Sequence, residues 1–400
     1  MSDFEIRTLR DDEVRAAGDL FRASLHVPPC ADADWERVSR AYQPGRTLGA
    51  FDTGLIGTAR SFDAELTVPG GASLPMAGVT GVAVRADRTR RGVLRALMAA
   101  QLADFATRGM VFASLLASEA PIYGRFGYGL ALRHRTYSVD RHRARLRPDV
   151  PAAGEVRLLE LDEALEVCPG VYERLAGRPG RMSRPEVLWR LYEAQSRRNP
   201  QPFRAAVHHG PDGPDGLAFY YVEGLQAHPW TKNLQLLDMF AGTPAAFAGL
   251  WRFLLGIDLV DRIVAEARPL DEPIELILED HRTATVDRVG DEHWIRLVDV
   301  PKALAAREYG NAAPVVVEVE DPLLPANGGT YRIGPEGAER TGEPAALRLD
   351  VTTLAMVYFG TWRPSALAGA GRIEVRAPSV LADADALFGT RVASWSGTHF

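Results

Sequence analysis

The stretch of sequence that most constrains the fold is GVAVRADRTRRGVLRALMAAQLADFATRG, which runs from residue 81 to residue 109. Val82 and Val84 alternate with small residues and predict a strand. After a polar turn, apolar residues recur at intervals of three and four, which predicts a long amphipathic helix that Gly109 ends. Its apolar stripe consists of Leu94, Leu97, Met98, Leu102 and Phe105. The fold must therefore place a sheet and a long helix on either side of one short basic turn.

The same turn carries groups that suit a phosphate. A helix N-terminus leaves about four backbone N–H groups unpaired and has a partial positive charge. Gly92 allows close approach of a ligand to the backbone, and Arg90 and Arg91 add positive charge beside it. These features predict a pyrophosphate site. The alternative is a capped helix with two solvated arginines. A Walker loop and a Rossmann fingerprint are excluded, because GK[ST] and GxGxxG are absent.

The length and the charge of the chain limit the remaining possibilities. Its 400 residues exceed what one hydrophobic core holds, so we expect two or three domains. The 46 basic and 52 acidic residues give a net charge of −6. This balance argues against partners such as nucleic acid or an anionic membrane surface.

The cysteines and the histidines indicate neither disulfides nor a metal site. Cys30 and Cys168 are far apart, and no CxxC, HxH or HExxH spacing occurs. The first residues lack the apolar segment of a signal peptide, and no run approaches the roughly 18 apolar residues that span a membrane. We therefore expect a soluble cytoplasmic protein without a metal and without a membrane span.

Changes in composition along the chain predict three domains. The polar, Arg-rich stretch RHRARLRPDVPAAGE indicates a boundary near residue 150. The order of strands and helices after it repeats the first part in outline, and beyond about residue 290 the strands and helices become shorter. We expect an α+β protein with domains at 1–150, 151–289 and 290–400.

Several segments of the sequence carry a resemblance to a known family. The pattern strand, V-x-V-x5-R-R-G, helix resembles the acyl-coenzyme-A loop of GCN5-related N-acetyltransferases (GNAT), although Thr89 and Leu94 depart from its usual residues. Together with ASEAPIYGRFGYG, TPAAFAGLWRFLLGIDLV, HWIRLVDV and the terminal Phe400, it is similar to the enhanced-intracellular-survival (Eis) type. The resemblance covers nearly the whole chain. It implies two tandem GNAT-like mixed-sheet domains and a C-terminal domain like sterol carrier protein 2.

The resemblance also implies a co-substrate, acetyl-coenzyme A, and the residues that bind it. In such a protein the backbone of the strand residues would pair with the pantetheine arm as an added strand does. The loop and the first helical turn would surround the pyrophosphate, and two residues after the next strand would lie beside the thioester. The residues implied are Val82, Ala83, Val84, Arg90, Arg91, Gly92, Val93, Leu94, Arg95, Ser118 and Glu119.

Acyl transfer to an amine needs a proton donor for the leaving thiolate and a proton acceptor for the ammonium. The resemblance implies that Tyr123 is the acid and that the α-carboxylate of Phe400 is the base. The residues alone favour the alternatives, in which Tyr123 is a core tyrosine and the chain end is frayed. We assign Tyr128, in the same segment, a structural role only.

The acceptor is expected to be a small cationic amine such as an aminoglycoside, a polyamine or a lysine side chain, as the family implies. Candidate pocket residues are His26, Asp34, Trp35 and Asp291. The acidic residues around Trp35 could instead favour a helix N-terminus. A hexamer is implied by the resemblance alone.

Other functions remain open. Duplicated acetyltransferase folds also occur in enzymes that transfer fatty-acyl or aminoacyl groups, and a non-catalytic lipid-binding or scaffold protein is a further alternative. The turn of the second domain that corresponds to the basic one reads MFAGTPAAFAGLW and has no arginine for a phosphate. We therefore expect no coenzyme in the second domain.

Overall fold

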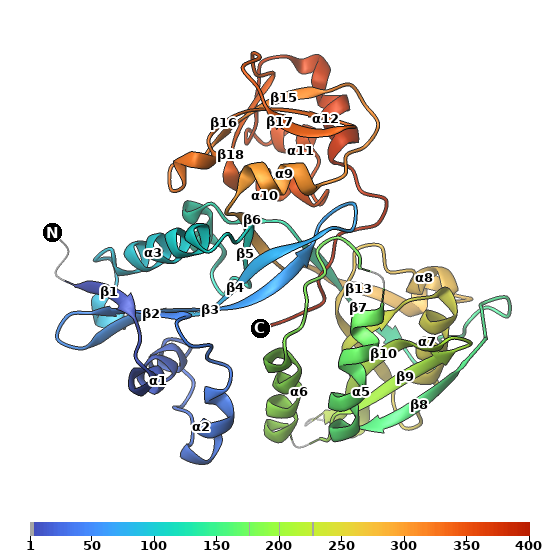
Figure 1. Ribbon diagram of the computed structural model, residues 1–400. Coiled ribbons are helices and arrows are strands. Elements are labelled where there is room, and N and C mark those ends of the chain that lie inside the picture. The colour runs from blue at the N-terminus through green and yellow to red at the C-terminus, as the bar shows by residue number, and fades with distance from the viewer. Residues whose placement is uncertain (1–3, 176, 200, 226–227) are drawn as a thin grey trace. The chain divides into compact units, whose positions relative to one another are not determined.

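The computed structural model describes residues 4–175, 177–199, 201–225 and 228–400. The chain forms two compact units (Figure 1). Unit one contains the chain up to Leu132 together with His293–Arg391, and unit two contains Arg133–Glu292 together with Val392–Phe400. Each unit is therefore built from two separate pieces of the sequence.

Unit one holds a seven-stranded sheet in the order β1-β2-β3-β4-β5-β14-β6. Its strands are β1 (Glu5–Thr8), β2 (Thr47–Phe51), β3 (Leu55–Thr67), β4 (Ser73–Val84), β5 (Phe112–Leu115), β14 (Trp294–Leu297) and β6 (Gly129–Leu130). Its helices are α1 (Val14–Ser24), α2 (Asp32–Ser39), α3 (Val93–Thr107) and α4 (Ala120–Tyr123). Figure 1 shows α3 on one face of this sheet and α1 and α2 on the other.

The predicted stripe of α3 is largely confirmed, because Leu97, Met98, Leu102 and Phe105 are buried while Leu94 is partly exposed. Gly109 follows the helix with φ +72°, a left-handed conformation that a glycine adopts without strain. The local sequence pattern was sufficient to predict this helix, because its apolar face and its stop both lie within the segment.

The C-terminal part of unit one is a smaller α+β domain. Its five-stranded sheet has the order β17-β16-β15-β18-β19. The strands are β15 (Val315–Glu320), β16 (Gly329–Gly334), β17 (Gly337–Arg340), β18 (Leu347–Asp350) and β19 (Glu374–Val375), and the helices are α9 (Val300–Ala306), α10 (Val351–Tyr358), α11 (Pro364–Gly369) and α12 (Leu381–Phe388). Helix α10 packs against β6 and β14 of the seven-stranded sheet. The sequence patterns did not predict β17 or α11.

Unit two holds a second seven-stranded sheet, in the order β13-β7-β12-β11-β10-β9-β8. Its strands are β7 (Arg133–Asp140), β8 (Glu155–Glu160), β9 (Arg204–Gly210), β10 (Gly213–Leu225), β11 (His228–Ala241), β12 (Arg262–Arg268) and β13 (Ala284–Asp291), and its helices are α5 (Leu161–Arg174), α6 (Glu186–Arg198), α7 (Pro244–Gly256) and α8 (Ile274–Ile277). On β9, Ala205 packs with the cluster of α5, whereas Ala206 packs with Trp251 of α7. Helices α5 and α7 therefore cover opposite faces.

Short 3-10 helices complete the two units. They are Asp11–Glu13, Ala86–Arg88, Gly124–Phe126, His281–Thr283, Pro325–Asn327 and Pro378–Val380.

The two seven-stranded sheets repeat the same plan and exchange one strand each. In both, four antiparallel strands lead to a parallel neighbour, β4 with β5 and β11 with β12. The next position is filled by β14 in the first sheet and by β7 in the second. In the sequence, β7 directly follows β6 of the first sheet but pairs in the second. Strand β14 directly follows β13 of the second sheet but pairs in the first. The duplication inferred from the sequence is present, but the exchange was not predicted, and the boundaries at residues 150 and 290 stay predictions.

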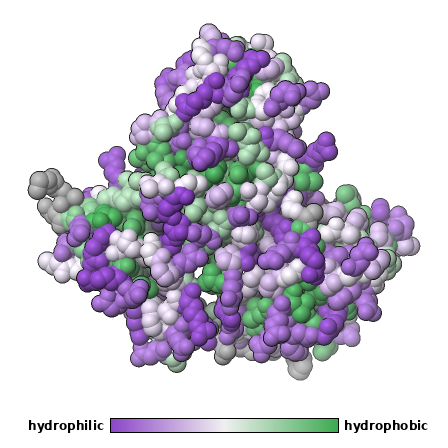
Figure 2. Space-filling model, viewed as in Figure 1, coloured by the Kyte–Doolittle hydropathy of each residue, from purple (hydrophilic) through white to green (hydrophobic). Residues whose placement is uncertain are grey.

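In the described parts of the chain, no helix is both long enough and apolar enough to cross a membrane. Among the same residues, no group of three or more His, Cys, Asp or Glu side chains gathers as metal ligands would. On the face shown in Figure 2, hydrophilic side chains cover most of the C-terminal part of unit one, at the top of the view.

Candidate functional site

The site begins where two parallel strands of the first sheet separate. Strands β4 and β5 pair only from Met76 with Phe112 to Gly78 with Ser114. Beyond Gly78, β4 continues to Val84 while keeping its pairing to β3 on the other side. Among the described residues no strand pairs with the β5 side of residues 82–84. The backbone of Val82, Ala83 and Val84 is therefore available to an added extended chain, as the resemblance implied.

A bulge and a left-handed turn shape this edge. The register between β3 and β4 shifts between Thr58 and Arg60, and Gly81 has φ +61° at that point. Such a bulge bends a strand and redirects its groups. Further on, Gly92 is the N-cap of α3 with φ +83°, and no side chain caps the helix. A Cβ at Gly92 would meet nothing within 4 Å among the described residues, and the first N–H groups of α3 have no partner within the helix.

A cavity of about 420 Å³ lies against this helix N-terminus. Its lining includes four arginines, namely Arg88, Arg90, Arg95 and Arg125. Arg88 pairs with Asp52 at 2.8 Å. No carboxylate of the described residues pairs with the other three. Because their charge is not neutralised by the protein and α3 adds the positive end of its dipole, the cavity is suited to an anion with several phosphates.

The predicted phosphate-binding residues are largely brought together here. The cavity is lined by Val84, Arg90, Gly92, Val93, Leu94 and Arg95. Arg91 is exposed next to it but does not line it. Arg90 itself has φ +62°, a left-handed conformation that is uncommon for an arginine. Arg125, Phe126 and Leu323 also line the cavity, and the sequence did not point to them.

Tyr123 ends the short helix α4, close behind β5. Its side chain is buried, and its ring meets Tyr128 edge-on with 6.1 Å between centroids. Burial raises the pKa of the Tyr123 hydroxyl, and the charge of Glu119 adds to this effect. The hydroxyl therefore keeps its proton through the neutral range. Ser118 and Glu119 are exposed in the same segment, and Glu119 is the N-cap residue of α4.

The predicted control, Tyr128, differs from Tyr123 in its surroundings. Tyr128 is fully buried, and none of the described residues is a hydrogen-bond partner of its hydroxyl. Burial raises the pKa of Tyr128 far above its usual value. A hydroxyl that is sealed off in this way has no route to a ligand, so this environment fits a structural role.

At two positions of the GRFGYG segment, neighbouring atoms leave no room for a side chain, so a glycine is required. Gly127 has φ +84°, and a Cβ there would lie 2.5 Å from Nε of Arg296. A Cβ at Gly129 would lie 2.2 Å from the carbonyl oxygen of Thr352. Arg296 is fully buried, donates to the Phe126 carbonyl at 3.0 Å and pairs with the buried Asp321. The C-terminal domain thus supports the segment that carries Tyr123.

Of the predicted acceptor-pocket residues, three lie in unit one and one lies in unit two. His26 is exposed with φ +56° just after α1. Asp34 lies in the first turn of α2 and pairs with Arg37, which fits the alternative of an acid at a helix N-terminus. Trp35 packs against Tyr42 with 5.9 Å between ring centroids. Asp291 lies in unit two, at the end of β13.

Sequence reasoning missed Arg60, on β3 beside the bulge. Its guanidinium lies over the ring of Tyr42 at 4.4 Å, and a Cβ on Gly81 would lie 3.7 Å from its Nε. Arg60 makes no ion pair with the described residues, and burial lowers the pKa of its guanidinium. These contacts connect Trp35, through Tyr42 and Arg60, to the strand that ends at Val84. An arginine in a half-buried strand position would have been the only signal.

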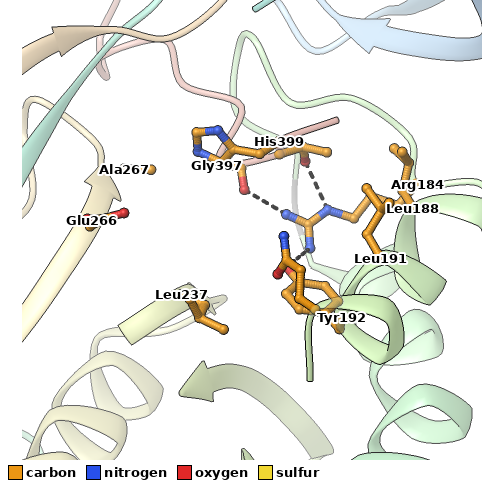
Figure 3. A pocket seen from close by; sticks show the side chains of 11 residues that line it. Arg184, Leu188, Leu191, Tyr192, Leu237, Glu266, Ala267, Gly397 and His399 are labelled. Atoms are coloured by element: carbon orange, nitrogen blue, oxygen red, sulfur yellow. Dashed lines mark hydrogen bonds between the residues drawn. The ribbon is translucent and has the colours of Figure 1, made fainter. Parts of the chain in front are cut away.

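The end of the chain is not frayed. Residues 394–398 are buried within unit two, and Phe400 is partly buried. The Trp395 indole donates to the Ala267 carbonyl at 2.7 Å. Gly397, Thr398 and His399 line a cavity of about 170 Å³ together with Arg184 and Tyr192 (Figure 3).

Comparison with known proteins agrees with this architecture. The family described as acetyltransferase (GNAT) domain matches residues 5–131, and a second family of that description matches residues 180–297. The sterol carrier protein domain family matches residues 300–397. The chain thus has two acetyltransferase domains and one sterol-carrier-like domain, all of mixed α+β structure.

Individual relatives cover most of the chain. An uncharacterized N-acetyltransferase of Streptomyces coelicolor is 38% identical over 410 residues, which cover 98% of each protein. The N-acetyltransferase Eis of Mycobacterium tuberculosis is 36% identical over 358 residues, which cover 86% of each. The crystal structure of Eis1 from Mycobacterium abscessus matches with a TM-score of 0.91 and 38% identity over 99% of this chain and 100% of that one. The chain therefore belongs to the Eis N-acetyltransferases of the GCN5-related superfamily.

Proposed function

We propose that this acyltransferase moves the acetyl group of acetyl-coenzyme A to a primary amine of a small cationic acceptor. The observation that carries the proposal is the basic cavity at the open N-terminus of α3, beside the unpaired edge of β4. Phosphates would bind Arg90, Arg95 and Arg125, and the thioester arm would extend along Val82–Val84. Arg91, outside the cavity lining, would add only long-range attraction.

The reaction is a direct attack. The amine nitrogen bonds to the thioester carbonyl carbon, the carbon–sulfur bond breaks, and the electron pair leaves with sulfur. Tyr123 would give its proton to that sulfur, which its raised pKa permits at neutral pH. The α-carboxylate of Phe400 would take the proton that the ammonium must lose. A carboxylate with a reference pKa of roughly 3.3–3.7 is a weak base in water, so it would act desolvated or through a water molecule.

The proposed proton acceptor can be tested in one assay. Thiol release from acetyl-coenzyme A is measured over a panel of aminoglycosides, polyamines and lysine derivatives, for the natural chain, a chain without Phe400 and a chain with one glycine added after Phe400. The added glycine moves the carboxylate and keeps the ring. We expect kcat to fall strongly in both altered chains, with an unchanged melting temperature.

Full activity of both altered chains on every amine would contradict the role of the terminal carboxylate. Tight acetyl-coenzyme A binding with no amine-dependent thiol release from the natural chain would contradict the function itself. Replacing acetyl-coenzyme A by longer acyl thioesters in the same assay tests the acyl group.

A further inference from the structure

The last residues of the chain are held by a buried pair of opposite charges in unit two. The side chains of Arg184 and Asp238 are 2% and 1% exposed, and Nη1 of Arg184 pairs with the carboxylate of Asp238. The Tyr192 hydroxyl donates to the same carboxylate at 2.6 Å. A buried arginine with a partner of this kind is charged, and removing either member would leave an uncompensated charge.

The remaining donors of Arg184 point at the chain end. Nη2 donates to the Gly397 carbonyl at 2.8 Å, and Nε donates to the Thr398 hydroxyl at 2.9 Å. Figure 3 shows the guanidinium of Arg184 facing Gly397. The three nitrogens of the planar Arg184 guanidinium thus bind Asp238, Gly397 and Thr398. Because the guanidinium is planar and rigid, it fixes the orientation of the last residues as well as their position.

Glu292 binds the backbone N–H of Gly397, the residue whose carbonyl Arg184 binds. Its carboxyl group accepts from the Gly397 N–H at 2.6 Å and from the Ser396 N–H at 3.4 Å. Glu292 is 1% exposed. The N–H and the carbonyl of Gly397 are therefore both bound by buried side chains, which come from different parts of unit two.

Gly397 turns the chain sharply at this point. Its φ is +65°, and a Cβ there would lie 2.3 Å from the Trp395 ring and 2.9 Å from the Phe240 ring. The Trp395 ring itself is buried against Phe240, with 4.8 Å between centroids. Only a glycine fits this position, so the direction in which residues 398–400 leave the turn is set by the fold.

We infer that Arg184 and Glu292 are positioning residues of the reaction, which clamp Gly397 and so confine the carboxylate of Phe400 to the place where it accepts the proton. This inference rests on the proposed function. Phe400 lies three residues beyond the clamp, and a chain spans at most about 3.3–3.6 Å per residue, so the carboxylate stays within roughly 10 Å of Gly397. Ordering the tail in advance removes an entropy loss from the catalytic step.

The test removes both buried charges at once. The double variant Arg184→Met with Asp238→Leu avoids the unpaired charge that either single change would leave. The matched control is His208→Phe with Asp215→Leu, a polar pair of β9 and β10 in unit two whose other hydrogen bonds go to Ala153 and Thr243. Two quantities are measured for each: kcat with its KM for acetyl-coenzyme A, and the rate at which a carboxypeptidase that prefers aromatic ends releases Phe400.

We expect the Arg184 and Asp238 variant to release Phe400 at least tenfold faster and to lose roughly 10²-fold in kcat, with KM for acetyl-coenzyme A unchanged. The control should keep both rates. Arg184→Lys keeps the positive charge but loses the planar guanidinium. Its kcat and its rate of Phe400 release should lie between those of the double variant and those of the control. The Lys variant also carries the test if the double variant does not fold.

Unchanged kcat in the double variant and in Arg184→Lys would overturn the inference, as would unchanged release of Phe400. Failure of the proposed function has a different signature, because removal of Phe400 would then leave kcat unchanged even though release remained sensitive to the clamp.

Discussion

The two acetyltransferase domains share one plan but end their parallel strands in opposite ways. In the first, among the residues that the structure describes, no side chain caps α3 at Gly92 and no carboxylate pairs with the neighbouring Arg90 and Arg95. In the second, the Thr243 hydroxyl caps α7 by accepting from the Ala246 N–H at 3.0 Å, and it donates to Asp215 at 2.9 Å. Pro244 removes a further donor. The same helix N-terminus is thus open to an anion in one domain and closed in the other.

The short helices that follow the parallel strands β5 and β12 also carry different groups in the two domains. Helix α4 follows β5 with Pro121, Ile122 and Tyr123, and α8 follows β12 after Pro273 with Ile274 and Glu275. The first domain places a protonated hydroxyl there, whereas the second places a carboxylate. Duplication therefore kept the scaffold in both domains, and the groups suited to coenzyme chemistry stand in only one.

The largest expected effect concerns Tyr123. Tyr123→Phe should lower kcat by roughly 10²–10⁴-fold, because the leaving thiolate loses its proton donor. The matched change Tyr128→Phe should leave kcat unchanged, since that hydroxyl is buried and has no hydrogen-bond partner within the described part of the chain. Steady-state thiol release measures both. Equal losses in the two variants would show that the segment acts only through its packing.

The next effect tests the open helix. Arg90→Glu with Arg95→Glu should weaken acetyl-coenzyme A binding by about 10²-fold or more, because each lost charge-assisted bond to phosphate is worth about 1.5–3 kcal/mol. Arg252→Glu, an exposed change on α7 of the second domain, is the control. Titration calorimetry reports both affinities. A loss of similar size in the control would mean that net charge alone attracts the coenzyme.

The third prediction concerns the pH dependence of stability, which the buried Glu292 of unit two should impose. Burial raises the pKa of Glu292 to about 8, against the opposing effect of the Gly397 and Ser396 N–H groups. The folded state then holds a proton that the unfolded chain releases near pH 4.5, so stability falls as the pH rises from about 4.5 to about 8. Glu292→Gln should flatten this part of the profile.

Urea unfolding at pH 5, 7 and 9 provides the measurement for that profile. The natural chain should lose stability relative to the Gln variant across the series. A difference that is constant with pH would contradict a raised pKa for Glu292.

The smallest effects compare the two helix starts directly. Thr243→Ala should cost about 1 kcal/mol, as the loss of an N-cap does. Gly92→Ala should cost about 1–2 kcal/mol through its left-handed backbone. Only the Gly92 change should also raise KM for acetyl-coenzyme A. Thermal unfolding and steady-state kinetics distinguish the two outcomes, and an unchanged KM in the Gly92 variant would count against close approach of the ligand.

Sequence patterns predicted the parts of the molecule that are decided locally. The strand, turn and helix around Gly92 were predicted because their periodicity and their stop signals lie within thirty residues. Changes in composition along the chain predicted three domains, and the resemblance supplied the family. The arginines at positions 60 and 125 were not predicted, since their roles depend on which strands and loops the fold brings beside them.

The same limit applies to the buried pairs. Arg184 contacts Thr398 from 214 positions away in the sequence, and Arg296 supports a segment 170 positions earlier. No periodicity or spacing relates residues so distant. The patterns predicted the strand β7 without indicating its sheet, and they did not predict β14 as a strand, because pairing across sheets is decided by tertiary packing.

The strand exchange has a consequence for how the protein is made. Chains emerge from the ribosome at about 5–20 residues per second, and domains usually fold in the order of their synthesis. Here the first sheet cannot close when residue 130 emerges, because the position between β5 and β6 belongs to Trp294–Leu297. That strand follows on the order of ten seconds later. The domain that begins first is therefore completed only after the second domain has been synthesised.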